Sequence, residues 1–280
     1  LISNKVTIPD NNSPQLILLK KSITIVSYLQ SLLLKLDLDI FRISQITLLI
    51  SSLFFFSGIY LVVLNLLKSV FSKNLRIVSF LFTVLVLIFD SHLPHTDYPN
   101  AFFSYATSGI FSIALSTLIF GLIAGGKNKS VVFFSILLIF IHPIQGLWIS
   151  GILLLTYILI IFLSEKKITY KKIKRIIFIF FILTTVFLYY FFSHSNSFVS
   201  INEDRNLLEV WLNNWETHRN NITFNFNYLK ITSLLFLICV IYIFIFKRKN
   251  KNLFNFFLSL GLTSSISSLI YILYKIFYTS

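Results

Sequence analysis

The sequence predicts an all-α polytopic membrane protein with about eight transmembrane helices, preceded by an amphipathic helix in the membrane interface. Three observations predict this class. Apolar residues make up 56% of the chain and charged residues only 12%, a balance that a single water-soluble domain does not need. Apolar runs long enough to cross a bilayer recur along the chain. Basic clusters stand at the ends of these runs.

Fifteen of the 24 lysines and arginines fall into four clusters at alternate turns. Because cationic loops resist translocation, these turns are expected to face the cytoplasm. We attribute the net charge of +14 to this topology and to anionic lipid headgroups, and expect no nucleic-acid partner. The clusters are Lys68/Lys73/Arg76, Lys127/Lys129, Lys166/Lys167/Lys171/Lys172/Lys174/Arg175 and Lys247/Arg248/Lys249/Lys251.

Residues 44 to 280 are predicted to form a transmembrane helical domain. The fourth and fifth spans share one apolar run, residues 130 to 163, which as a single helix would reach about 50 Å and overshoot the bilayer. We therefore expect a hairpin that turns near Pro143 or Gly146 and keeps the basic clusters on one side. The expected spans are 44 to 67, 77 to 90, 102 to 124, 130 to 142, 146 to 163, 176 to 192, 229 to 246 and 253 to 274.

Residues 1 to 43 are less apolar and are predicted to lie on the outer face. From Ser13 to Leu38 the pattern is amphipathic, which is typical of a helix that lies in the interface. One face of this helix is expected to carry Leu16, Leu19, Ile23, Val26, Leu33 and Leu34. The same topology places nine of the ten acids and all five histidines on the outer side, so any chemistry is expected there.

The outer loop of residues 90 to 101 carries two carboxylates and two imidazoles, from Asp90, His92, His95 and Asp97. These groups are typical ligands of a divalent metal ion, the one cofactor that the sequence suggests. The carboxylates of Asp90 and Asp97 would equally serve as a general base. A solvated turn with histidines bonded to neighbouring carboxylates explains the same residues.

A second polar group interrupts the fourth and fifth spans at His142, Gln145 and Trp148. A histidine near the membrane core is costly without a partner or a cavity, so it indicates substrate binding. The structural alternative is a turn made by proline and glycine, with the tryptophan at the interface and the histidine satisfying a freed carbonyl.

The third group lies in the outer loop of residues 194 to 229. Arg205, Trp215, His218 and Arg219 are its substrate-binding candidates, because aromatic faces pack on sugars and arginine pairs with phosphate oxygens. An aromatic belt at the membrane interface is the alternative interpretation.

The short basic turn at residues 125 to 129 and the His-Pro-x-x-Gly-x-Trp sequence at residues 142 to 148 are similar to features of bacterial integral membrane glycosyltransferases of the GT-C type. The resemblance implies transfer of a sugar from a polyprenyl-phosphate donor on the outer face of the inner membrane, in cell-surface polysaccharide or lipid glycosylation. It also implies a catalytic aspartate just after a first span. Asp10 is the matching position, and the chain, which contains no methionine, is expected to lack that span.

Together these interpretations predict that Asp10, Asp90 or Asp97 deprotonates an acceptor hydroxyl. Arg219 and Arg205 would neutralise the phosphate leaving group. Alternatives from other classes are a multispan transporter or flippase, a polysaccharide polymerase for lipid-linked glycans, and a non-catalytic membrane partner. A transporter predicts internal repeats and ionisable residues near the membrane midplane, and the sequence has neither in a convincing form.

The predicted sidedness is testable by cysteine labelling in a Cys239→Ser background. His92→Cys and His218→Cys are expected to react with an impermeant maleimide in intact cells, and Lys129→Cys only after permeabilisation. Labelling of either histidine position solely from the cytosol would invert the topology.

Overall fold

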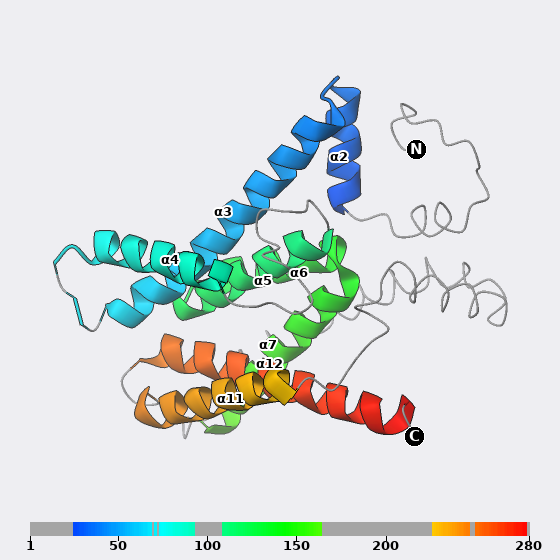
Figure 1. Ribbon diagram of the computed structural model, residues 1–280. Helices are drawn as coiled ribbons and strands as arrows, with labels where there is room; N and C mark the ends of the chain where they lie inside the picture. Colours follow the sequence, from blue (N-terminus) through cyan, green and yellow to red (C-terminus); the bar gives the residue numbers. More distant parts are fainter. Residues whose placement is uncertain are drawn as a thin grey trace.

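The computed structural model describes residues 25–68, 70–71, 73–92, 108–163, 226–246 and 250–278. Every regular element in these ranges is an α-helix, which confirms the predicted all-α class (Figure 1). The helices are α2 (Ile25–Lys35), α3 (Ile40–Leu67), α4 (Leu75–His92), α5 (Ser108–Ala124), α6 (Asn128–Ile141), α7 (Pro143–Leu163), α11 (Phe226–Phe246) and α12 (Lys251–Tyr278).

Each expected span coincides with one of these helices, except 176 to 192, which lies outside the described residues. Within the described ranges, α3 and the Lys251–Ile270 part of α12 are long and apolar enough to cross a bilayer. The other described apolar stretches are shorter. Length and composition therefore support membrane insertion through two helices, and the eight crossings remain a prediction.

The predicted break in the long apolar run occurs at His142. Helix α6 ends at Ile141 and α7 begins at Pro143, the first helical position, where the missing N–H of proline costs no hydrogen bond. The Tyr157 hydroxyl lies 3.4 Å from Asn128 Oδ1, so α7 returns to the level at which α6 began. The two helices therefore form the expected antiparallel hairpin.

Helix α5 lies at the centre of the bundle, in contact with α3, α6, α7 and α12. Its side chains at Ala114, Leu115 and Ile119 are fully buried. Leu115 and Ile119 belong to the main hydrophobic cluster together with residues of α6, α7 and α12. An apolar helix that is buried on several sides needs no polar face. Accordingly, the only polar side chains of α5 are the small hydroxyls of serine and threonine, and it carries no charge.

Helices α3 and α5 approach most closely at Gly58 and Gly121. A Cβ atom added to Gly121 would lie 2.8 Å from the Cα of Gly58, and one added to Gly58 would lie 2.7 Å from the backbone nitrogen of Leu118. Either distance is shorter than a normal van der Waals contact. Only glycine at both positions lets the two backbones meet in this way.

Three contacts bring the basic turns to one end of the bundle. Gly125 lies against the side chain of Asn65, near the end of α3, and Gly126 lies against Asn252, in the first turn of α12. The Asn128–Tyr157 hydrogen bond adds the later part of α7 to this end. The described basic residues of these turns that lie beside the contacts are Lys68, Lys127, Lys129 and Lys251.

Helix α2 covers the described part of the predicted amphipathic helix. Val26 is buried in the hydrophobic cluster, and Gln30 donates a hydrogen bond of 3.3 Å to Thr47 on α3. Leu29, Leu32 and Leu36 are more than half exposed, which leaves α2 a second apolar face. Such a face is compatible with an interfacial position; residues 1 to 24 lie outside the described part.

Replacing Gly121 by alanine is expected to destabilise the protein by about 1–3 kcal/mol, because the added methyl group forces α3 and α5 apart. The readout is the thermal unfolding midpoint of the purified protein in detergent. Gly151→Ala is the matched control, since a Cβ at Gly151 meets nothing within 4 Å. The control is expected to be neutral or stabilising by up to about 1 kcal/mol. Equal midpoints for the two variants would contradict the close contact.

Candidate functional site

The structure describes one of the three predicted polar groups in detail, the turn between α6 and α7. Asp90 and His92 occupy the C-terminal turn of α4, but their side chains fall outside the described part of the chain. The remaining predicted site residues also lie outside it: Asp10, His95, Asp97, Arg205, Trp215, His218 and Arg219.

His142 joins α6 to α7 through its backbone and its ring. Its backbone N–H donates to the carbonyl of Leu138, 2.8 Å away, and its carbonyl accepts from the N–H of Gly146, also at 2.8 Å. Its ring Nδ1 accepts from the backbone N–H of Gln145 at 3.3 Å. The residue therefore caps the end of α6 and the start of α7 at once.

The ring bond determines which tautomer of the neutral histidine fits the site. A neutral imidazole has one acceptor nitrogen and one donor nitrogen, and Nδ1 is occupied as an acceptor. The proton must then be on Nε2. In this state Nε2 is the donor nitrogen of the ring, and Nδ1 is already engaged as an acceptor.

Gln145 connects the turn to α5. The hydroxyl of Ser112 hydrogen-bonds to the side-chain carbonyl of Gln145 and also lies 2.6 Å from the carbonyl oxygen of Gly109. Ser112 is fully buried, and Gln145 is partly buried. Gln145 thus links Ser112, through its side chain, and His142, through its backbone N–H, into one polar group, which we call the turn cluster.

Trp148 and Gly146 pack the turn onto the bundle. Trp148 is partly buried against the main hydrophobic cluster, so its described contacts are those of a packing residue. A Cβ on Gly146 would overlap the backbone of Ile139, which shows how tightly the two helices close at this point. These two residues hold the turn cluster in place.

The turn cluster lies at the opposite end of the bundle from the basic turns. Counting 1.5 Å per helical residue, His142 is about 21 Å from the start of α6, and Ser112 is about 18 Å from the end of α5. The two distances, measured along separate helices, are similar, so His142 and Ser112 lie at about the same distance from the basic turns. This separation matches the predicted sorting of basic residues to one side and His142 to the other.

The metal prediction for Asp90, His92, His95 and Asp97 stays open. Within the described ranges, no three His, Cys, Asp or Glu residues come together as a metal site would require. Most of the predicted ligands lie beyond those ranges, so this observation does not bear on them.

No protein-family model, curated protein or solved structure matches the chain. The similarity to GT-C glycosyltransferases therefore remains a prediction from the residues.

Sequence reasoning missed Ser112 as a partner of Gln145. The signal was present as Ser108, Ser112 and Ser116, spaced four residues apart within an apolar run, which marks one helix face. Which other helix that face meets depends on tertiary packing, and the sequence of α5 alone does not contain it.

Ser112→Ala is expected to lower stability by about 1–2 kcal/mol, because the carbonyl of Gln145 loses its partner in a low-dielectric setting. Ser116→Ala is the matched control on the same helix, since the Ser116 hydroxyl bonds only to the Ser112 carbonyl among the described contacts. Removing such a bond within a helix is expected to change stability by less than about 0.5 kcal/mol. Thermal unfolding in detergent measures both, and identical midpoints would contradict a link between α5 and α7.

Proposed function

We propose that the chain is a multispan membrane glycosyltransferase that takes a sugar from a polyprenyl-phosphate donor at the membrane face opposite the basic turns. The observation that carries the proposal is the turn cluster, a polar group recessed in an apolar bundle and held by a helix-capping histidine. The GT-C similarity of the same His-Pro-x-x-Gly-x-Trp segment supplies the chemistry. The bacterial inner membrane and cell-surface glycosylation belong to this proposal.

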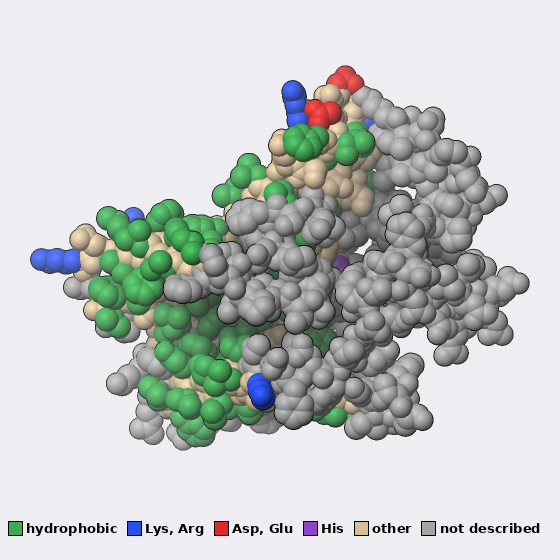
Figure 2. Space-filling view, in the orientation of Figure 1, with side chains coloured by type: hydrophobic (Ala, Val, Ile, Leu, Met, Phe, Trp, Pro, Cys, Tyr) green, Lys and Arg blue, Asp and Glu red, His purple; other side chains and the backbone are tan. Residues whose placement is uncertain are grey.

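A membrane is the solvent that fits the described surface. Only 17% of the residues in the most apolar stretch of α3 are buried, whereas a core helix of a water-soluble protein is mostly buried. Large apolar side chains on α4 and α11 are also more than half exposed, among them Ile77, Leu234 and Phe244. Figure 2 shows hydrophobic side chains over α3 and α4, with lysine or arginine side chains beyond them at the end where the two helices join. Lipid would cover such a surface, and water would not.

The depth of the turn cluster suits a lipid-linked substrate. A hydrocarbon core of about 30 Å exceeds the roughly 21 Å that α6 reaches from the basic end. The cluster would therefore lie about 9 Å below the outer boundary of the hydrocarbon core, at the level of the first isoprene units of a donor. Hydrogen-bonding groups at this depth would orient the sugar or phosphate without exposing the site to bulk water.

The proposed reaction assigns different tasks to carboxylates and to the turn cluster. A carboxylate of Asp10, Asp90 or Asp97 would take the proton of the acceptor hydroxyl while the oxygen of that hydroxyl attacks the anomeric carbon of the donor sugar. The bond from that carbon to the donor phosphate breaks, and Arg205 and Arg219 would stabilise the departing anion. His142, held in place by its capping bonds, would help to position the donor or the acceptor.

The proposal predicts loss of transfer without loss of folding in one histidine variant. His142→Asn keeps a side-chain acceptor for the Gln145 N–H but removes the rest of the imidazole ring, Nε2 included. Transfer is expected to fall by about 10²-fold with little change in thermal unfolding, because positioning is lost while the cap remains. The assay measures polyprenyl phosphate released by proteoliposomes of the full-length protein, for a panel of polyprenyl-phosphate sugars.

Two comparisons in the same assay separate the alternatives. His142→Ala removes cap and donor together, and if His142→Asn transfers like wild type while His142→Ala unfolds, the histidine is only a cap. Asp10→Asn, Asp90→Asn and Asp97→Asn are tested singly, and one of them is expected to lose about 10²- to 10⁴-fold in rate. Undiminished transfer in all three refutes the carboxylate scheme. Movement of the lipid-linked sugar across the bilayer without any transfer favours a flippase.

A further inference from the structure

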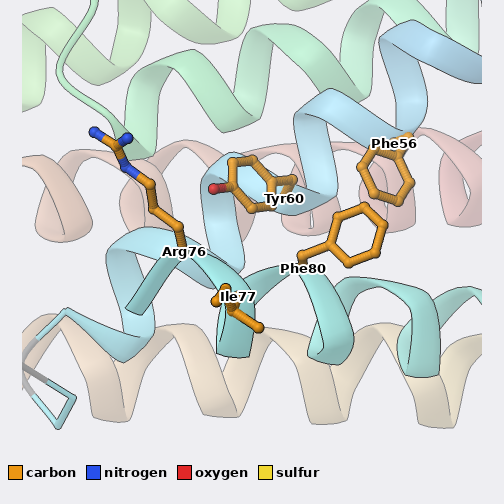
Figure 3. A pocket seen from close by; sticks show the side chains of 5 residues that line it. All are labelled: Phe56, Tyr60, Arg76, Ile77 and Phe80. Atoms are coloured by element: carbon orange, nitrogen blue, oxygen red, sulfur yellow. The ribbon is translucent and has the colours of Figure 1, made fainter. Parts of the chain in front are cut away.

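A groove lies between α3 and α4, at the end of the bundle that carries the basic turns. It is a shallow, open groove with a volume of about 340 Å³, lined by Phe56 and Tyr60 from α3 and by Arg76, Ile77 and Phe80 from α4. Figure 3 shows Arg76 at one side of the groove, with the Tyr60 hydroxyl pointing toward that side and the rings of Phe56 and Phe80 close together at the other side. The volume is at the lower end of small-ligand sites, roughly 300–1,000 Å³, and too small for a helix.

The lining changes from charged to apolar with depth. Arg76 is the second residue of α4, and Phe80 lies about 6 Å farther along the helix. On α3, Tyr60 lies about 10 Å from the helix end at Leu67, and Phe56 about 16 Å from it. The Phe56 and Phe80 ring centroids are 5.5 Å apart and form the inner wall. A guanidinium, then a phenol, then bare aromatic rings follow the order of a lipid headgroup, glycerol region and acyl chain.

The charge around the groove is one-sided. Lys68 and Lys73 belong to the same turn as Arg76, and all three are exposed. The sequence contains no aspartate or glutamate from residue 40 to residue 89. On the N-terminal side of this acid-free stretch, Asp37 and Asp39 precede α3 and lie at its far end. Asp90, the one acid in the sequence of α4, lies in its last turn, about 21 Å along the helix from Arg76. On α3 and α4, therefore, no acid lies near this turn along the chain to offset its attraction for an anion.

We propose that this groove binds one anionic phospholipid, with the phosphate at Arg76 and an acyl chain along Phe80 and Phe56. Lys68 and Lys73 add long-range attraction that selects a net negative headgroup over a zwitterionic one. The proposal rests on membrane insertion, and it is independent of sugar transfer.

The test measures lipid binding to the full-length protein by native mass spectrometry in detergent, with phosphatidylglycerol and phosphatidylcholine of identical acyl chains. Wild type is expected to bind phosphatidylglycerol more tightly. Arg76→Gln is expected to weaken phosphatidylglycerol binding about fivefold, the usual effect of one basic residue at an anionic lipid surface. Its effect on phosphatidylcholine is expected to be smaller.

Arg42→Gln is the matched control. It removes the same charge from the same pair of helices, but at the far end of α3, where Arg42 pairs with Asp39 at 3.1 Å. Equal weakening by Arg42→Gln and Arg76→Gln would overturn the proposal in favour of non-specific electrostatics.

The apolar part of the groove has its own variant. Phe80 is 49% exposed, so Phe80→Ala is expected to fold, and it should weaken binding of both lipids because it removes acyl-chain contact. Unchanged binding of both lipids by Phe80→Ala would overturn the acyl-chain placement.

A soluble competitor distinguishes a lipid from a free phosphate ion. Glycerol phosphate at millimolar concentration is expected to leave phosphatidylglycerol bound, because it lacks the chain. Complete displacement would identify a simple anion site and overturn the lipid assignment. Loss of sugar transfer in the earlier assay has no bearing on these readouts, so the two proposals fail separately.

Discussion

The contact between Gly58 and Gly121 is the constraint on which the arrangement of helices depends. Helix α3 carries α2 and α4, and α5 carries α6, α7 and α12, so the junction of α3 with α5 joins two halves of the bundle (Figure 1). In a lipid environment apolar side chains gain little by leaving the solvent, and helix association depends on close packing. Thr117, Gly121 and Gly125 repeat every four residues on the face of α5 that meets α3, which is the small-residue spacing that such packing uses.

Polar side chains inside the bundle act in two ways. Many hydroxyls bond to the carbonyl four residues earlier in their own helix, as Thr83 does to Ser79 and Ser135 to Val131, which satisfies them without a neighbour. A few connect different helices: Gln30 with Thr47, Ser112 with Gln145, and Thr156 with Ser259 at 3.1 Å. Contacts between glycines and aliphatic side chains do not by themselves fix how two helices are aligned. The hydrogen bonds between helices add this specificity. Register between α5 and α7, and between α7 and α12, is therefore defined by named pairs.

Sequence reasoning predicted the features that follow from local chemistry or from bilayer dimensions. Pro143 cannot continue a helix, and a 34-residue run is too long for one crossing, so the break at His142 could be predicted. The convergence of Lys68, Lys127 and Lys251 at one end could be predicted from the cost of moving basic loops across a membrane. The residues that contact the turn between α6 and α7 could not be predicted from the sequence. Ser112 lies 33 residues before Gln145. The packing of Trp148 against the hydrophobic cluster depends on helices that the turn sequence does not specify.

The groove between α3 and α4 also depends on tertiary packing that the sequence does not reveal. The sequence alone explains Arg76 as one of the basic residues that mark the cytoplasmic side of the membrane. The packing of α4 on α3 brings Phe56 and Tyr60 next to Arg76. This packing places one residue of the basic cluster at the edge of an apolar groove. Topology and ligand binding draw on the same residue types, so composition cannot separate them.

His142 shows why a structural role and a functional one can coexist in a single residue. Its backbone is held from both sides, by Leu138 in α6 and by Gly146 in α7, and its ring is held through Nδ1. The capping bond stabilises α7, and it also orients the imidazole and assigns the proton to Nε2. A side chain whose backbone, ring plane and tautomer are all determined in advance loses little entropy when it helps to position a ligand. The capping role therefore supports the positioning role proposed for this histidine and does not compete with it.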